Sequence, residues 1–253
     1  MAYYDEIARQ WHAVTGYAGG AFKELALNDA LLRHVSGIEG RAILELGAGN
    51  GYFMPLVLRR FSGQTPAAIV VTDQSEALLR IARTQFRLPG AIYQRLDVRQ
   101  PFPFAAGEFD VVLASMLFNE VPNAGFRHAL QECRRVLAPD GLLLMAVLHP
   151  EFVHSLDERG VLKPARGGVL TMPGADRLRL PVVIRSLATY ERLLTEAGFD
   201  FEQEDVFPTE TVLNARAGLR HAQGVPLAAV FCCTPRGQAS GGVTPEAQAR
   251  RER

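Results

Sequence analysis

Apolar residues in the first 150 positions follow two alternating patterns. Short apolar runs, long enough for buried strands and too short for helices, lie at 43–46, 67–72, 91–96, 111–114 and 142–148. Between these runs, apolar residues recur at helical spacing at 52–61, after Ser75 and at 124–137. This alternation of strands and helices predicts a doubly wound, mostly parallel sheet with helices on both faces.

The two ends of the chain follow other patterns. Residues 3–14 carry an amphipathic stripe that includes Tyr4 and Trp11, and a second helix is predicted at 22–35. Residues 149–182 show no clear period, so we expect an irregular insertion over the carboxyl ends of the strands, where a substrate cap would lie. A helix between Ser186 and Gly198 and two strands at 201–207 and 226–233 follow. The polar tail at 237–253 is expected to be disordered.

Composition narrows the classes of partner. The 253 residues carry 27 basic and 27 acidic side chains, so the net charge is zero and a nucleic-acid partner is not expected. The apolar run at 142–148 is far shorter than the roughly 20 residues that span a bilayer, and the first ten residues lack a signal-peptide pattern. Three cysteines show no metal-ligand spacing. We expect a cytoplasmic monomer or homodimer with no metal and no membrane partner.

A glycine turn follows the first apolar run in the sequence E-L-G-A-G-N-G. Such a turn between a buried strand and a helix lets the backbone approach a ligand and directs N–H groups toward it. A dinucleotide-binding turn would place its third glycine at position 52, which is tyrosine. The segment instead resembles motif I of the class I S-adenosylmethionine-dependent methyltransferases. The resemblance assigns cofactor contacts to Glu45, Gly47, Ala48, Gly49, Asn50 and Gly51.

Acidic residues end the next two predicted strands. Asp73, about twenty residues beyond the glycines, could accept hydrogen bonds from both hydroxyls of a ribose, or could simply help to cap the following helix. In the family this acid binds the ribose, which assigns Asp73 and the adjacent Gln74 to the cofactor. Asp97 and Val98 match the family positions that contact the adenine. The alternative for Asp97 is an acidic residue on a surface loop.

The resemblance continues through F-D-V-V-L-A-S-M and R-R-V-L-A-P-D-G-L-L-L. It implies that Ser115 and Met116 hold the methionine part of the cofactor. It also implies a seven-stranded Rossmann-like sheet whose last strand is antiparallel. One domain is then expected at 1–236. It would consist of lid helices at 1–37, a cofactor-binding core at 38–148, a cap at 149–182, and a helix with a strand pair at 183–236.

The acceptor side is predicted from looser signals. The opening Y-D-x-I-A-x-x-W resembles the lid helix of many small-molecule methyltransferases, although a helix that only packs on the surface remains the alternative. Residues expected to contact the substrate are Tyr4, Trp11, Asn119, Phe152 and Met172. His149 and His154 are candidate general bases by position, although a histidine in a loop is more often merely exposed.

Three functions are compatible with these observations. The first is methyl transfer from S-adenosylmethionine to an oxygen, nitrogen or carbon atom of a small, partly apolar metabolite. The second is a catalytically silent protein of the same fold that binds the cofactor as a sensor or scaffold. The third, an NAD(P)-dependent oxidoreductase, is disfavoured by the glycine spacing and by the lack of a Tyr-x-x-x-Lys pair.

Overall fold

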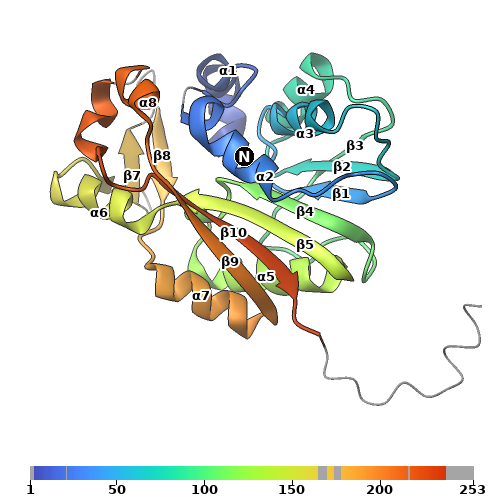
Figure 1. The fold of residues 1–253 in the computed structure, drawn as a ribbon. Helices are drawn as coiled ribbons and strands as arrows, with labels where there is room; N and C mark the ends of the chain where they lie inside the picture. Colours follow the sequence, from blue (N-terminus) through green and yellow to red (C-terminus); the bar gives the residue numbers. More distant parts are fainter. Residues whose placement is uncertain (1–2, 21, 165–169, 174–177, 216, 238–253) are drawn as a thin grey trace, which may run out of the picture.

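A seven-stranded sheet forms the centre of the protein in the computed structural model, which describes residues 3–20, 22–164, 170–173, 178–215 and 217–237 (Figure 1). Its strands lie in the order β3-β2-β1-β4-β5-β10-β9. Their bounds are β1 Ala42–Glu45, β2 Ala68–Asp73, β3 Ile92–Arg95, β4 Phe109–Ser115, β5 Leu137–Leu148, β9 Phe199–Val206 and β10 Ala228–Pro235. The first five strands are parallel, and β10 is antiparallel to both β5 and β9. The predicted mostly parallel Rossmann-like sheet with an antiparallel last strand is confirmed.

Helices cover both faces of this sheet (Figure 1). One face carries α2 (Asn28–Arg33), α3 (Phe53–Arg60) and α4 (Glu76–Gln85), and the other carries α5 (Asn123–Val136) and α7 (Leu187–Glu196). The central strands have apolar side chains on both sides, because both faces are buried against helices. The sheet order reverses between β1 and β4, and ligands of open α/β sheets bind at such switch points beyond the carboxyl ends of the strands.

Two predicted elements have different bounds from those observed. The helix expected at 22–35 is split into a π-helical turn, η1 (Lys23–Leu27), followed by α2. The amide Nδ2 of Asn28 donates to the carbonyl of Ala18 at 3.0 Å and holds this junction to the preceding loop. The fifth strand begins at Leu137, directly after α5, because Leu137 already pairs with Phe109 across an irregularity in β4.

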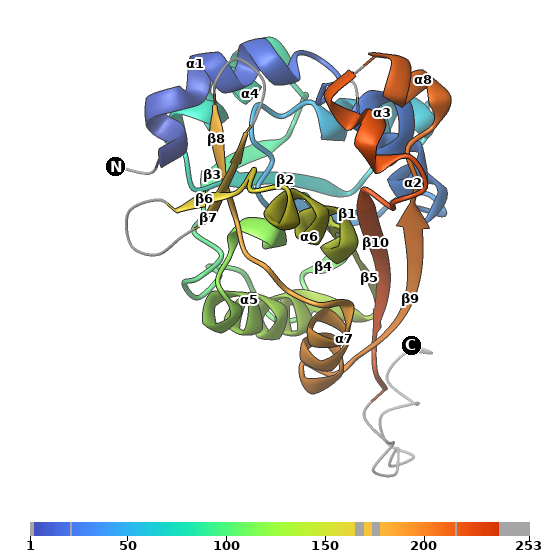
Figure 2. The same cartoon turned by 90° about the vertical axis from the view of Figure 1, so that its left-hand side faces the viewer.

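Regular structure also appears where the sequence predicted none. The expected irregular insertion contains α6 (Pro150–Glu158) and a three-stranded antiparallel sheet of β6 (Lys163–Pro164), β7 (Leu170–Pro173) and β8 (Arg179–Val182). The polar gap before β10 contains α8 (Glu210–Ala215) and η5 (Ala217–Ala222). These elements lie together at one end of the main sheet and share a small apolar core (Figures 1 and 2). Their strands and helices are too short to show a period in the sequence.

The N-terminal helix α1 (Tyr3–Thr15) lies beside α4, against which Tyr4 and Ala8 pack through Leu78 (Figure 2). Its Asp5 carboxylate accepts from the Ser75 hydroxyl at 2.7 Å and from the backbone N–H of Ala77 at 3.1 Å. The expected disordered tail, from residue 238 onward, lies outside the described residues. No helix within the described ranges has the length and apolar character needed to cross a membrane.

Candidate active site

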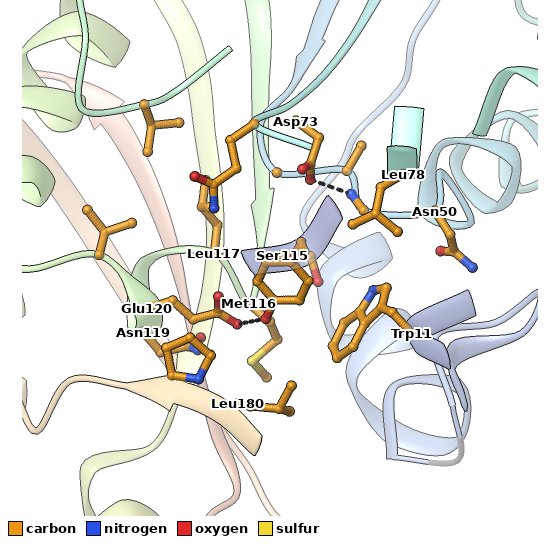
Figure 3. Close-up of a pocket in the computed structure, with 18 of the residues that line it drawn as sticks. Trp11, Asn50, Asp73, Leu78, Ser115, Met116, Leu117, Asn119, Glu120 and Leu180 are labelled. Carbon is orange, nitrogen blue, oxygen red and sulfur yellow. Dashed lines mark hydrogen bonds between the residues drawn. The ribbon is translucent and has the colours of Figure 1, made fainter. Parts of the chain in front are cut away.

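A cavity of about 280 Å³ lies at the carboxyl ends of β1, β2 and β4, with α1 along one side (Figure 3). The structure brings most of the predicted site residues to its wall. These are Tyr4, Trp11, Glu45, Gly47, Ala48, Gly49, Asn50, Asp73, Gln74, Asp97, Val98, Ser115, Met116 and Asn119. They come from positions 4 to 119, so the fold gathers residues that the sequence showed only as separate motifs.

The glycine turn connects β1 to α3 and forms one wall of the cavity. The backbone N–H of Gly49 donates to Oδ2 of Asp73 at 2.8 Å, which joins the ends of β1 and β2. Gly49 has a φ of +59°, and a Cβ there would lie 3.4 Å from Nε1 of Trp11. Gly51 has a different role, because it does not line the cavity and its missing Cβ leaves room for Ala82 of α4. Gly51 is therefore required for the packing of the turn against α4, whereas Gly49 is the glycine that faces the cavity.

Asp73 is a buried carboxylate at the tip of β2. Its Oδ1 accepts from the backbone N–H of Ser75 at 2.8 Å, and Ser75 caps α4 through its hydroxyl. Burial raises the pKa of Asp73 to about 6, against the opposing effect of the hydrogen bonds from Ser75 and Gly49. Asp73 thus holds the glycine turn and the start of α4 in place, and it also lines the cavity. Support of the helix start and binding of a ribose are therefore compatible roles for this residue.

Asp97 and its neighbour Arg99 form a more exposed pair on the same wall. Arg99 donates through Nε and Nη2 to the two carboxylate oxygens of Asp97 at 2.8 and 2.7 Å. These hydrogen bonds lower the pKa of Asp97 below its ordinary value. Oδ1 also accepts from the backbone N–H of Arg99 at 3.0 Å, so the lone pair with which Asp97 can still accept from a ligand is on Oδ2.

Glu45 and Lys23 place opposite charges in the buried part of the cavity. Glu45 ends β1, and its Oε2 has no hydrogen-bond partner among the described residues. Burial raises the pKa of Glu45 to about 8 and lowers the pKa of Lys23 to about 8, while each group favours the charged form of the other. The Lys23 ammonium also lies 5.2 Å from the centre of the Tyr52 ring.

Glu120 and Tyr4 form the second polar pair, in which Tyr4 is buried and Glu120 is half-buried. The hydroxyl of Tyr4 donates to Oε1 of Glu120 at 2.6 Å, which links α1 to the 3₁₀ turn η2 (Phe118–Glu120) (Figure 3). Burial raises the pKa of Glu120 to about 8 and raises that of Tyr4 as well. Beside this pair, Oδ1 of Asn119 is buried and has no partner among the described residues.

Met116 is a strained residue at the end of β4. Its φ is +59°, a left-handed conformation that is uncommon for a residue other than glycine. The backbone N–H of Met116 donates to the carbonyl of Ala146 at 2.8 Å, which keeps the residue tied to β5. Strain of this kind concentrates at functional sites. Here it turns the chain from β4 into η2 and so brings Asn119 and Glu120 to the cavity.

The structure does not bring the two candidate histidines to the cavity. His149 is buried at the start of α6, where its Nδ1 accepts from the backbone N–H of Glu151 at 3.2 Å and its Nε2 lies 3.5 Å from Asp205. His154 lies on the exposed side of α6 next to Glu158. Because neither lines the cavity, we do not carry either histidine forward as a base.

Two predicted substrate contacts are also not gathered at the site. Phe152 is buried in the small core of α6, α8 and β8 and does not line the cavity. Met172 belongs to β7, but its side chain lies outside the described part of the structure. Within the described ranges, no group of three or more His, Cys, Asp or Glu side chains could hold a metal ion.

Sequence reasoning missed six polar residues that line the cavity: Tyr3, Thr15, Lys23, Tyr52, Arg99 and Glu120. Glu120 follows directly after a predicted contact, so its position beyond β4 was a usable signal. Lys23 gave no signal, because its side chain reaches the cavity through the π-helical turn η1. Such turns often occur at functional sites but cannot be recognised from apolar spacing.

Comparisons with known proteins agree with this geometry. A family described as a methyltransferase domain matches residues 43–141. Malonyl-[acyl-carrier protein] O-methyltransferase of Methylococcus capsulatus is 32% identical over 136 residues, which are 52% of this chain and 46% of that protein. Trans-aconitate 2-methyltransferase of an Acidovorax species is 35% identical over 113 residues, or 45% and 40% of the two chains. The chain thus spans less than half the length of these curated relatives.

A solved structure extends the likeness to nearly the whole fold. The S-adenosylmethionine-dependent methyltransferase from Mesorhizobium loti has a TM-score of 0.63 and 22% identity over 86% of this chain and 99% of that one. At this identity the similarity concerns the fold, while the sequence match covers the glycine turn and the strands around it. The strand order, the motifs and the comparisons together support a class I S-adenosylmethionine-dependent methyltransferase.

Proposed function

We propose that the protein binds S-adenosylmethionine in this cavity and transfers its methyl group to a small, partly apolar molecule. One observation carries the proposal: Glu45, whose buried Oε2 has no partner among the described residues, lies in the same cavity as Lys23, Asp73 and the backbone of Gly49. Buried polar groups in proteins are normally satisfied, so an unsatisfied one inside a cavity indicates a ligand that supplies the missing partner.

The residues present match the chemical groups of the cofactor. An amino-acid end carries an ammonium and a carboxylate, for which Glu45 and Lys23 offer the opposite charges. A ribose offers two hydroxyl donors, and Asp73 is the carboxylate at the tip of β2 that suits them. Asp97 and the backbone of Val98 can bind an adenine edge. Ser115 and Met116 line the cavity between these two ends.

The other part of the cavity suits a small acceptor. Its walls include Trp11, Leu117, Leu180 and Pro181, which are apolar, and the polar groups of Asn119 and Glu120 lie among them (Figure 3). Apolar walls with a few placed polar groups are typical of small-molecule sites. Helix α1 separates this part from the solvent through the contacts of Tyr4 and Asp5. A protein or nucleic-acid chain would need a more open surface.

The chain contributes alignment and exclusion of water to the reaction. When bound, S-adenosylmethionine supplies an electrophilic methyl group on a sulfonium. The charged residues at the cofactor end fix its position, while Trp11 and Leu180 from opposite sides limit where an acceptor can lie. Alignment of two reactants in this way can account for about 7–11 kcal/mol of a barrier.

Isothermal titration calorimetry tests the proposal directly. We expect S-adenosylmethionine and S-adenosylhomocysteine to bind and NAD not to bind. Binding of NAD in place of both would support the oxidoreductase alternative. Release of S-adenosylhomocysteine with candidate acceptors then separates an enzyme from a cofactor-binding scaffold. Since the two curated relatives are named for carboxylic acids, malonyl thioester and trans-aconitate should be included among the candidates.

A further inference from the structure

Glu120 is the cavity carboxylate that the proposed cofactor contacts leave without a role. Under the proposed function, Glu45 and Lys23 bind the amino-acid end and Asp73 binds the ribose. Glu120 lies instead on η2, beyond the end of β4, next to Asn119 and Leu180 of the acceptor part (Figure 3). Even partial burial of a carboxylate is costly unless a partner stabilises its charge, so the position of the half-buried Glu120 favours a cationic partner.

The groups around Glu120 offer little positive charge. The hydroxyl of Tyr4 donates to it from α1, and Asp73 of β2 adds a second negative charge nearby. Lys23 of η1 is the cation that acts on Glu120, and Lys23 also faces Glu45. The cavity therefore has three carboxyl groups, Glu45, Asp73 and Glu120, for one lysine in its buried part. Once ionised, these carboxyl groups repel an anionic acceptor and attract a cationic one.

Hydrogen bonding favours the same kind of acceptor. Oδ1 of Asn119 is buried and has no donor in the part of the chain that the structure describes, and Glu120 has capacity to accept beyond its bond from Tyr4. These oxygen atoms can therefore accept hydrogen bonds that a ligand donates. An amine has N–H groups for both oxygens, while a carboxylate has none.

The backbone around Glu120 is held firmly. The carbonyl of Asn119 accepts from the N–H of Val183 at 2.8 Å. Arg185 donates to the carbonyls of Phe118 and Val121, on either side of η2, at 2.9 and 2.7 Å. A rigid support of this kind keeps a functional group in place before the ligand arrives.

We propose that Glu120, oriented by the hydroxyl of Tyr4, binds the amino group of an amine acceptor and takes its proton during methyl transfer. The nitrogen lone pair forms the new bond to the methyl carbon as the carbon–sulfur bond breaks, and the electron pair of that bond stays on sulfur. A cationic acceptor first gives one proton to the Glu120 carboxylate, which frees this lone pair, and the methylated nitrogen then carries the positive charge that the sulfonium loses, so charge and atoms balance. Glu120 is then a catalytic residue and Tyr4 a positioning residue. The inference rests on the proposed methyltransferase function and narrows its acceptor to an amine.

Sinefungin provides a test that does not require the acceptor. In this analogue a carbon with an ammonium group replaces the sulfonium and its methyl, so a positive amine points toward the acceptor part. Calorimetry should show that the wild-type protein binds sinefungin more tightly than S-adenosylhomocysteine. In Glu120→Gln that preference should fall about tenfold, while the affinity for S-adenosylhomocysteine changes less than threefold. A fall in preference smaller than threefold overturns the proposal.

Glu45→Gln is the matched control, because it removes a buried carboxylate from the same cavity at the cofactor end. It should weaken the binding of sinefungin and of S-adenosylhomocysteine by the same factor and leave the ratio of the two affinities unchanged. A loss of preference in Glu45→Gln as large as in Glu120→Gln would mean that any negative charge in the cavity has this effect, which contradicts a specific role for Glu120.

The wild-type protein gives a second readout if Glu120→Gln fails to fold. The pKa of Glu120 is raised to about 8 by burial, with Tyr4, Asp73 and Lys23 as the groups that face it. Its carboxylate form therefore increases between pH 6.5 and 8.5, and the preference for sinefungin should increase with it. If the ratio of the affinities for sinefungin and S-adenosylhomocysteine stays constant between pH 6.5 and 8.5, the proposal is overturned. If wild-type protein binds neither S-adenosylmethionine nor S-adenosylhomocysteine, the proposed function itself fails.

Discussion

Two regions of the molecule bury charged side chains in opposite ways. Arg185, before α7, is 4% exposed, and its three nitrogens donate to Asn123 Oδ1, Phe118 O and Val121 O at 2.7 to 2.9 Å. The cavity carboxylate Glu45 is 3% exposed, and its Oε2 has no partner in the described structure. Burial is nearly equal for the two residues, but one is saturated with hydrogen bonds and the other is not.

The difference separates a structural charge from one for which we propose a functional role. Arg185 also lies between the rings of Phe126 and Tyr190, with its guanidinium carbon 4.7 Å from each ring centre. All its interactions are made within the protein, so its burial stabilises the fold. Glu45, Lys23 and Glu120 have pKa values shifted toward the neutral form because burial is not fully compensated. Such shifts concentrate at functional sites, where a ligand completes the interactions.

The largest effect is expected for Arg185→Met. The substitution removes the Arg185 donor of the Val121 carbonyl, leaves the Phe118 carbonyl only a long bond of 3.4 Å from the N–H of Val121, and removes both ring contacts. The free energy of unfolding should fall by about 3–5 kcal/mol, measured by urea denaturation. Arg192→Met, on the exposed side of α7 and paired with Glu196, is the control and should leave stability nearly unchanged. Equal effects of the two substitutions would show that Arg185 is not a structural charge.

Asp73→Asn should act on binding more than on stability. The amide keeps an oxygen for the N–H of Gly49 or Ser75 but lacks the negative charge and the second acceptor. Affinity for S-adenosylmethionine should fall by about 1–3 kcal/mol in calorimetry. Asp110→Asn is the matched control, since Asp110 accepts from the N–H of Ala42 at the other end of the sheet. Wild-type affinity in Asp73→Asn would refute the ribose contact.

Glu45→Gln should separate binding from folding. Because burial opposes the charged form of Glu45, a neutral side chain of equal shape should leave the free energy of unfolding unchanged or raise it by up to about 1 kcal/mol. Affinity for S-adenosylmethionine should still fall by about 1–2 kcal/mol. Glu132→Gln, whose carboxylate accepts from Phe102 N and Arg135, should do the reverse. A strongly destabilised Glu45→Gln would place Glu45 among the structural charges.

Stability should depend on pH through the cavity carboxylates. The pKa values of Glu45 and Glu120 are raised to about 8, above about 4.3 in an unfolded chain. The folded state then binds more protons, so their contribution is complete below about pH 4.3 and is lost as pH rises to 8. The pKa of Lys23 is lowered to about 8, so this residue changes the stability in the opposite direction, mainly above pH 8.

The free energy of unfolding should therefore fall by about 2 kcal/mol between pH 6 and 8 for each of the two carboxyl groups. Urea denaturation curves at pH 6, 7 and 8 measure the change. The double variant Glu45→Gln, Glu120→Gln should show a smaller decrease over the same range. If the variant and the wild type lose stability in parallel, other groups cause the pH dependence.

The smallest effect is expected for Arg99→Ala. Arg99 and Asp97 form a bidentate pair, but their side chains are 52% and 30% exposed, so water screens the interaction. Stability in urea should change by less than about 1 kcal/mol. A larger loss would mean that this surface pair behaves like the buried Arg185 cluster.

Prediction from sequence succeeded where one segment carries the whole signal. The glycine turn, the cap at Ser75 and the helix start at Ser186 depend on neighbouring residues, and each appears as expected. The prediction of an irregular insertion at 149–182 was wrong, because β6, β7 and β8 are only two to four residues long and form by pairing with one another. His149 was placed by its position after β5, but the structure uses its ring to cap α6.

The sequence by itself determined the strand–helix alternation, the parallel sheet and the acids at the strand tips, because backbone periodicity and turn chemistry are local. Tertiary structure decided which charges meet. Tyr4 and Glu120 are 116 residues apart, and Arg185 binds carbonyls 64 and 67 residues before it. No spacing rule links such positions, since their contact depends on how α1, η1 and the segment before α7 pack around the sheet. Whether a buried charge is satisfied or left for a ligand is a property of that packing.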